Sequence, residues 1–149
     1  MPGEYRNIYK TCRKSAGLTQ ESAAERLGIS VESLRAYENG QRIPPNHVVQ
    51  LMAILYNAVY LGLQHLQETD ALYRSVVPEI QPKSVLEASA KLTNRIFDFA
   101  GSHADRRLMR IVEDNVIDTA EQAEFDAILE DLEEIVEAAL ELRCAQRSS

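Results

Sequence analysis

Residues 20–40, QESAAERLGISVESLRAYENG, constrain this chain more than any other stretch of it. Their residue types occur where two short helices that cross over a tight turn would need them. Ala24 is small where the helices would touch, and Gly28 lies where the turn needs a residue without a Cβ atom. The aliphatic residues that would supply the shared core are Leu27, Ile29 and Leu34. The stretch therefore predicts two crossing helices joined by a short turn.

Capping residues predict the limits of both helices. The hydroxyl of Thr19 can accept from the free backbone N–H groups of a helix over residues 20–27. Ser30 can cap a second helix over residues 31–39, and Gly40 ends it where a left-handed residue is wanted. The pattern is that of a helix-turn-helix, whose second helix enters the DNA major groove.

The segments LTQESAAERLGIS and LRAYENGQRIPP resemble the lambda-repressor-like, Cro/CI-type helix-turn-helix regulators of phages and bacteria. The resemblance covers about residues 8–55 and implies a helical bundle that binds double-stranded DNA. In that family the Gln that opens the first motif helix contacts phosphate, which implies this role for Gln20. Early and outward positions of the second helix contact bases, and the resemblance places Val31, Glu32, Ser33 and Ala36 there.

The chemistry of these positions limits what they can recognise. Val31 and Ala36 offer only apolar contact to a thymine methyl, whereas Glu32 can accept from a cytosine amino group while it repels nearby phosphates. Four residues at the far end of the second helix and just after it are expected to contact the DNA backbone and so position the protein on the duplex: Arg35, Asn39, Gln41 and Arg42. The complete predicted DNA-binding set is Thr19, Gln20, Ser30, Val31, Glu32, Ser33, Arg35, Ala36, Asn39 and Arg42. The alternative is that these are solvated surface residues of a helical domain.

Charge is distributed unevenly along the chain, whose net charge is −7. Residues 1–57 hold seven Lys and Arg against five Asp and Glu, while residues 58–149 hold nine against eighteen. The basic residues near the motif are Arg6, Lys10, Arg13 and Lys14. DNA is therefore expected to meet the amino-terminal part, with modest non-specific affinity, and not the acidic remainder.

Apolar spacing extends the helical pattern beyond the motif. Residues 46–55 and then 58–75 predict two further helices, the second too apolar to stand alone. The segment PEIQPKS, residues 78–84, contains two prolines and predicts a linker. The expected organisation is a DNA-binding domain over residues 1–77 and an acidic helical hairpin over residues 85–149.

The hairpin is predicted from two long helical patterns, residues 85–112 and 120–145, joined by residues 114–119 and with an interruption near Gly101. The second pattern has an apolar stripe at coiled-coil spacing: Phe125, Ile128, Leu132, Ile135, Ala139 and Leu142. Its expected solvated face is acidic: Glu130, Asp131, Glu133, Glu134, Glu137 and Glu141. The combined stripes exceed what one hairpin can bury, which predicts a homodimer. The alternative is that the hairpin folds back onto residues 58–75 within one subunit.

Other chemistry is not expected. The oxygen donors Asp114, Asn115, Asp118 and Glu121 lack the glycine and alternating spacing of a calcium loop, and Thr119 is better explained as a helix cap. The three histidines, His47, His65 and His103, fall in no metal-binding frame, and Cys12 is expected to be a buried thiol far from Cys144. No nucleophile motif or phosphate-binding glycine loop occurs, so we expect neither catalysis nor a cofactor or metal. Without a signal-like segment or a membrane span, the expected location is cytoplasmic.

Two hypotheses follow for this all-α chain. The first is a dimeric, sequence-specific transcriptional regulator, a repressor that occupies operator DNA. The second is a protein-interaction module or antitoxin-like protein, with a degenerate helix-turn-helix and a tail that binds a protein partner.

Overall fold

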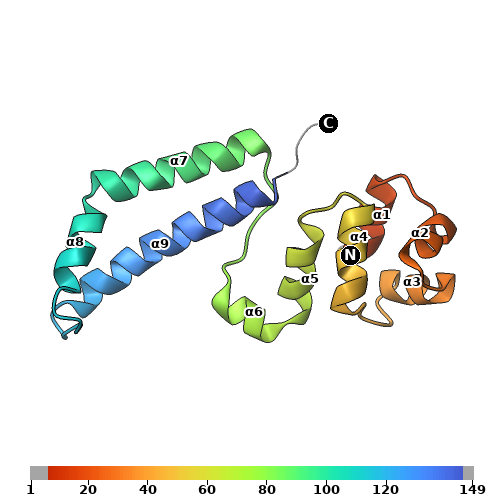
Figure 1. Ribbon diagram of the computed structural model, residues 1–149, viewed down its shortest axis with the longest axis horizontal. Helices are drawn as coiled ribbons and strands as arrows, with labels where there is room; N and C mark the ends of the chain where they lie inside the picture. The colour runs from red at the N-terminus through yellow and green to blue at the C-terminus, as the bar shows by residue number, and fades with distance from the viewer. Residues whose placement is uncertain (1–6, 146–149) are drawn as a thin grey trace, which may run out of the picture. The chain divides into compact units, whose positions relative to one another are not determined.

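Nine α-helices form the regular structure of residues 7–145, the part of the chain that the computed structural model describes (Figure 1). The prediction of an all-α fold is confirmed. The chain divides into two compact units, Met1–Val77 and Pro78–Ser149. None of the helices in residues 7–145 is both long enough and apolar enough to cross a membrane.

The first unit contains six of the helices: α1 (Ile8–Ser15), α2 (Gln20–Leu27), α3 (Val31–Glu38), α4 (Asn46–Leu55), α5 (Leu61–Thr69) and α6 (Ala71–Val76). The predicted bounds of α2 and α4 are confirmed, and α3 ends one residue earlier than predicted. The prediction of a single helix over residues 58–75 is wrong. At Asp70 the backbone is extended, with φ −122° and ψ 108°, and its carboxylate accepts from the Tyr73 N–H to begin α6. An aspartate that caps a new helix therefore separates α5 from α6.

One hydrophobic core holds the first unit together. Its buried members come from α1 to α5 and the loop residue Tyr56: Ile8, Tyr9, Ala23, Ala24, Leu27, Leu34, Tyr37, Val48, Val49, Met52, Tyr56 and Leu61. Ala24 is almost completely buried, as the crossing of two helices requires, and Ile29 packs against this core from the turn. Cys12 is a free thiol only partly buried against the core, and burial raises its pKa. The core thus fixes the angle between α2 and α3.

A buried polar bridge joins α1, α4 and α5 within this core. The Tyr9 hydroxyl lies 2.6 Å from Nδ1 of His65, and Nε2 of that ring lies 2.9 Å from Oδ1 of Asn46. Burial lowers the pKa of His65, which favours the neutral ring. A neutral ring that donates from Nε2 to Asn46 accepts at Nδ1 from Tyr9, so both ring nitrogens are satisfied.

The second unit consists of α7 (Val85–Gly101), α8 (Ala104–Ile111) and α9 (Gln122–Arg143). α7 packs along α9, and α8 contacts both helices. The predicted interruption near Gly101 is confirmed, because the chain turns at His103, which has a φ of 58°. Thr119 is not the cap of α9, contrary to the prediction. Instead, Asp118 and Glu121 exchange side-chain-to-backbone hydrogen bonds just before the helix.

The packing of α9 differs from its predicted pattern at two positions. Ala139 is exposed and Ala138 is buried, so at this turn of the helix the buried residue lies one position before the predicted one. Glu141, predicted to face solvent, is buried, with Lys83 Nζ and Lys91 Nζ 2.7 and 2.6 Å from its carboxylate. Burial alone raises the pKa of Glu141, but the two ammonium groups outweigh this effect and hold it below its ordinary range. The carboxylate is inside because α7 and the segment before it supply its counter-charges.

Candidate nucleic-acid interface

A side-chain cap begins each of the two motif helices, α2 and α3. Oγ1 of Thr19 accepts from the Ser22 N–H at 3.1 Å, and Oγ of Ser30 accepts from the Ser33 N–H at 3.0 Å. Gly28 ends α2 in the left-handed region with a φ of 70°. The predicted caps are therefore confirmed, and α3 begins at a fixed point relative to α2.

The predicted base-contacting residues of α3 do not share one environment. Glu32 is exposed, and Val31 and Ser33 are partly buried. The prediction that Ala36 faces outward is wrong, because this residue is only 9% exposed. The chain after Gly40 turns back toward α3, and the Arg42 N–H donates to the Ala36 carbonyl at 3.2 Å. Ala36 is thus removed from the candidate surface.

Arg35 connects α3 to the start of α2. Its Nε donates to Oε1 of Gln20 at 3.3 Å, and its Nη2 lies 3.6 Å from the carboxylate of Glu21. Gln20 in turn donates from Nε2 to Oε1 of Glu38 at 3.3 Å. These contacts orient two residues of the predicted DNA-binding set, Gln20 and Arg35, next to each other on the surface.

Glu38, which accepts from Gln20, also belongs to a buried ion pair with Arg13. Arg13 donates from Nε and Nη2 to the carboxylate of Glu38, each at 2.8 Å, and from Nη1 to the Leu18 carbonyl at 2.7 Å. The side chains are 8% and 3% exposed. Hydrogen bonding to Glu38 raises the pKa of the Arg13 guanidinium although burial opposes this. Arg13 is one of the basic residues near the motif, but its charge is neutralised by Glu38 and does not face solvent.

Lys10 and Lys14 are exposed, and Arg6 lies outside the described residues. The basic side chains that α1 presents to solvent are therefore the two lysines.

The end of α3 is ordered by local contacts. Asn39 is exposed and its Oδ1 accepts from the Gln41 N–H at 3.0 Å. The guanidinium of Arg42 lies 5.3 Å from the centre of the Tyr37 ring, within the range of a cation–π contact. Gly40 has a φ of 81°, which supports the reversal between them. Asn39 and Arg42 thus stay near the surface at one end of α3.

Three residues that support this surface are absent from the set predicted from the sequence: Asn7, Arg13 and Glu38. Asn7 caps α1 and donates from Nδ2 to the Tyr37 carbonyl at 2.9 Å, which ties the start of α1 to α3. The cap on α1 could have been found from the local sequence, since Asn is a favoured capping residue. The long-range bonds could not, because their partners are 30 and 25 residues apart.

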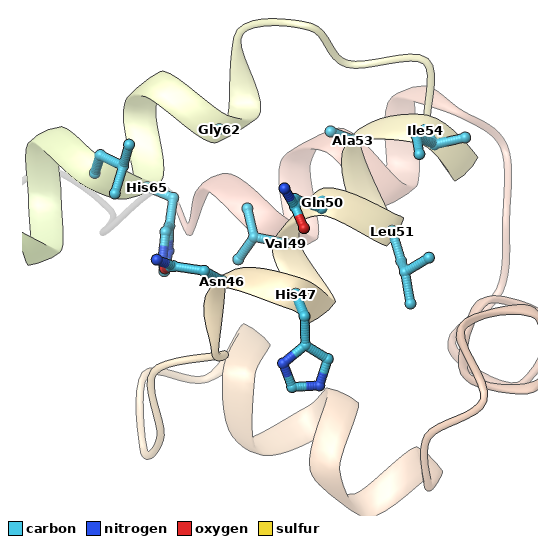
Figure 2. Close-up of a pocket in the computed structure, with 10 residues that line it drawn as sticks. Asn46, His47, Val49, Gln50, Leu51, Ala53, Ile54, Gly62 and His65 are labelled. Atoms are coloured by element: carbon cyan, nitrogen blue, oxygen red, sulfur yellow. The ribbon is translucent and has the colours of Figure 1, made fainter.

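A separate apolar groove lies between α4 and α5, with a volume of about 810 Å³ (Figure 2). At one end Asn46 and His65 point toward each other, while Leu51 and Ile54 line the α4 side. None of its lining residues belongs to the predicted DNA-binding set.

The loop before α9 carries the oxygen donors that were candidate metal ligands. Asp114 accepts from the Val116 N–H, while Asp118 and Glu121 bond each other's backbone. In the described part of the chain, no group of three or more His, Cys, Asp or Glu is placed to hold a metal ion. The loop carboxylates therefore serve local turn and cap geometry.

Part of the first unit matches a known family model. Residues 10–63 match the helix-turn-helix family model. The match runs from α1 into α5 and includes the α2–turn–α3 motif, which confirms the Cro/CI-type resemblance over this region. A search of the curated proteins and a search of the solved structures each gave no match. The helix-turn-helix domain supports a general role in DNA binding.

Proposed function

We propose that this chain is a sequence-specific transcriptional regulator that binds operator DNA as a homodimer and represses by occupying it. The observation that carries the proposal is the presentation of α3. Its exposed Glu32 and Arg35 project from a helix that is capped at Ser30 and held by the core. A helix in this setting can enter a major groove without rearranging, so little of the binding energy is lost in ordering the protein.

The proposed contacts divide by chemistry. Gln20, Arg35, Asn39 and Arg42 carry donors suited to phosphate oxygens, and the exposed caps Thr19 and Ser30 flank them. Glu32 is the polar candidate for base contact, as an acceptor for a cytosine amino group, with Val31 and Ser33 beside it. The burial of Ala36 leaves the base-contacting set smaller than the sequence predicted.

Selection of bound duplexes from random and genomic DNA, followed by sequencing, tests this proposal directly. We expect enrichment of a short motif with two-fold symmetry, and affinity that falls steeply with salt as counterions are released. If no duplex is enriched even at low salt, the regulator proposal is wrong. The second candidate, an interaction module or antitoxin-like protein, then becomes the better explanation, and exposed Glu32 on α3 is what favours it.

Single substitutions separate positioning from specificity. Arg35→Ala and Arg42→Ala should weaken binding to all duplexes similarly, whereas Glu32→Ala should change the preferred sequence. Arg106→Ala, an exposed arginine on α8, is the matched control and should leave both affinity and preference unchanged. Binding is measured by fluorescence anisotropy on the selected duplex and on a scrambled one. Unchanged preference for Glu32→Ala would remove that residue from the base-contacting set.

A further inference from the structure

α7 presents an apolar face to solvent although it belongs to a packed helical unit. Leu86 is 80% exposed and Phe97 is 70% exposed, and Ile96 beside them is half exposed. Ala90 and Thr93, which lie between Leu86 and Phe97 on the same side of the helix, are also exposed. We call Leu86, Ala90, Thr93 and Phe97 the α7 outer face.

The charges of α7 are confined to the other side of the helix. At 3.6 residues per turn, its four charged residues fall within an arc of about 80°: Glu87, Lys91, Arg95 and Asp98. Lys91 and Arg95 pair with Glu137 and Glu134 of α9, at 3.2 and 3.5 Å, so their side of the arc lies toward α9. Glu87 and Asp98, on the other side of the arc, are exposed. The α7 outer face is therefore both uncharged and turned away from its neighbour in the unit.

The residue pattern of the α7 outer face is the same in both directions. Its members are separated by four, three and four residues, and their sizes run large, small, small, large. When two copies of such a helix lie antiparallel, Leu86 of each copy can lie against Phe97 of the other, and Ala90 of each copy against Thr93 of the other. Small side chains at the centre let the two backbones approach closely, while large ones fill the ends.

We infer that the α7 outer face binds the same face of a second copy of this chain, antiparallel, about a two-fold axis between Ala90 and Thr93. The distribution of charge favours this surface for self-association. The second unit holds eight Lys and Arg against sixteen Asp and Glu, so two copies repel each other across most of it. The α7 outer face is an uncharged region on which they can meet. This inference rests on the homodimer in the proposed function and assigns its interface.

Charge substitutions on the full-length protein test the pairing and its direction. The wild type should sediment as a dimer at micromolar concentration, whereas Leu86→Asp and Phe97→Lys should each raise the dissociation constant by about tenfold or more. In the double variant the new carboxylate at position 86 faces the new ammonium group at position 97 of the other copy, so dimerisation should partly recover. Both changes suit the helix dipole, with the acid near the start of α7 and the base near its end, which preserves the fold. Ala123→Asp, which places the same charge at an exposed position in the first turn of α9, is the matched control and should remain dimeric.

Four outcomes separate the claims. A dimeric wild type whose Leu86 and Phe97 variants stay dimeric overturns the α7 interface but leaves the dimeric regulator intact. A monomeric wild type overturns the interface and the dimer together, whereas loss of DNA enrichment with the dimer preserved overturns only the DNA-binding proposal. Single variants that dissociate without recovery in the double variant overturn the antiparallel arrangement.

Disulfide formation gives a second readout of direction. Equal amounts of Ala90→Cys and Thr93→Cys protein, mixed and oxidised, should give a cross-linked heterodimer in excess over either homodimer, because residue 90 faces residue 93 of the other copy. The wild type contains Cys12 and Cys144, so its own cross-linked fraction is the baseline. Homodimers from each variant alone, in equal yield, would indicate parallel helices and refute the arrangement.

Discussion

Removing the carboxylate of Glu38 is the sharpest test of how the candidate surface is supported. Glu38→Ala leaves the Arg13 guanidinium buried, with the Leu18 carbonyl as its remaining hydrogen-bond acceptor. Breaking a buried ion pair by removing one partner costs about 3–5 kcal/mol. At about 0.05–0.15 kcal/mol per residue, a unit of this size has a free energy of unfolding of about 4–11 kcal/mol. We therefore expect a loss of roughly a quarter or more of its stability, and a melting temperature lower by at least about 12 °C.

Tyrosine signals isolate this unit from the rest of the chain. All six tyrosines lie at or before Tyr73, the chain has no tryptophan, and its phenylalanines absorb below the tyrosine band, so circular dichroism at the tyrosine wavelengths in urea follows the first unit. Glu25→Ala, exposed on α2, is the control and should change stability by less than about 0.5 kcal/mol. A cost below about 1 kcal/mol for Glu38→Ala, typical of an exposed pair, would refute the reasoning.

A paired replacement separates stability from DNA binding. Arg13→Met with Glu38→Leu removes both charges and should recover most of the lost stability, since apolar side chains of similar size can replace a buried ion pair. Gln20 would still lose the acceptor on Glu38 that orients it. A folded double variant with weaker DNA binding is therefore expected, whereas undiminished binding would show that the Gln20 contact with Glu38 is dispensable.

Three further predictions concern stability and pH. Burial lowers the pKa of His65, so the unfolded chain binds the proton more readily than the folded one. The first unit should therefore lose stability as pH falls below the ordinary value of 6.5. Urea titrations at several pH values measure this loss, and His65→Gln should remove it. The pKa of Glu141 is held low, so its contribution to stability should be lost as pH falls below 4.5 toward the lower pKa of the folded state. Thermal unfolding of the wild type and of Glu141→Gln, followed by far-ultraviolet circular dichroism, would show this loss. Gly28→Ala should lower the free energy of unfolding by about 1 kcal/mol, because residue 28 has a positive φ. Gly62→Ala, inside α5 with open space around it, should raise that free energy by up to about 1 kcal/mol. Equal changes for the two variants in urea unfolding would contradict this.

The parts of the fold that follow from local chemistry were predictable from the sequence. Thr19 and Ser30 cap helices through bonds to residues three positions away, and Gly28 adopts its left-handed conformation within the same turn. Such signals need no knowledge of the rest of the fold. The break at Asp70 is of the same local kind, but the apolar residues on both sides of it favoured one continuous helix.

Two other predictions were wrong because contacts from outside the helix decide which of its side chains are buried. Ala36 lies on a helix face that is outward in an isolated α3, and it is buried because the chain returns near it at Arg42. Glu141 lies among exposed carboxylates of α9, and only the positions of Lys83 and Lys91 distinguish it from them. Helical periodicity gives the direction of a side chain, but it does not show what covers that side chain.

The electrostatics of the two units connect the proposed function with the proposed interface. Arg13 is neutralised by Glu38, and Arg35 lies near Glu21, so the amino-terminal unit offers few unpaired positive charges to DNA. Few phosphate contacts mean weak binding by one copy, since affinity for DNA grows with the number of counterions released. Two copies held together convert the second contact into an intramolecular step and raise affinity without new contacts. If the proposed regulator is correct, a weakly basic first unit gains affinity for DNA from a partner copy, and the α7 outer face is the surface that we propose for that association.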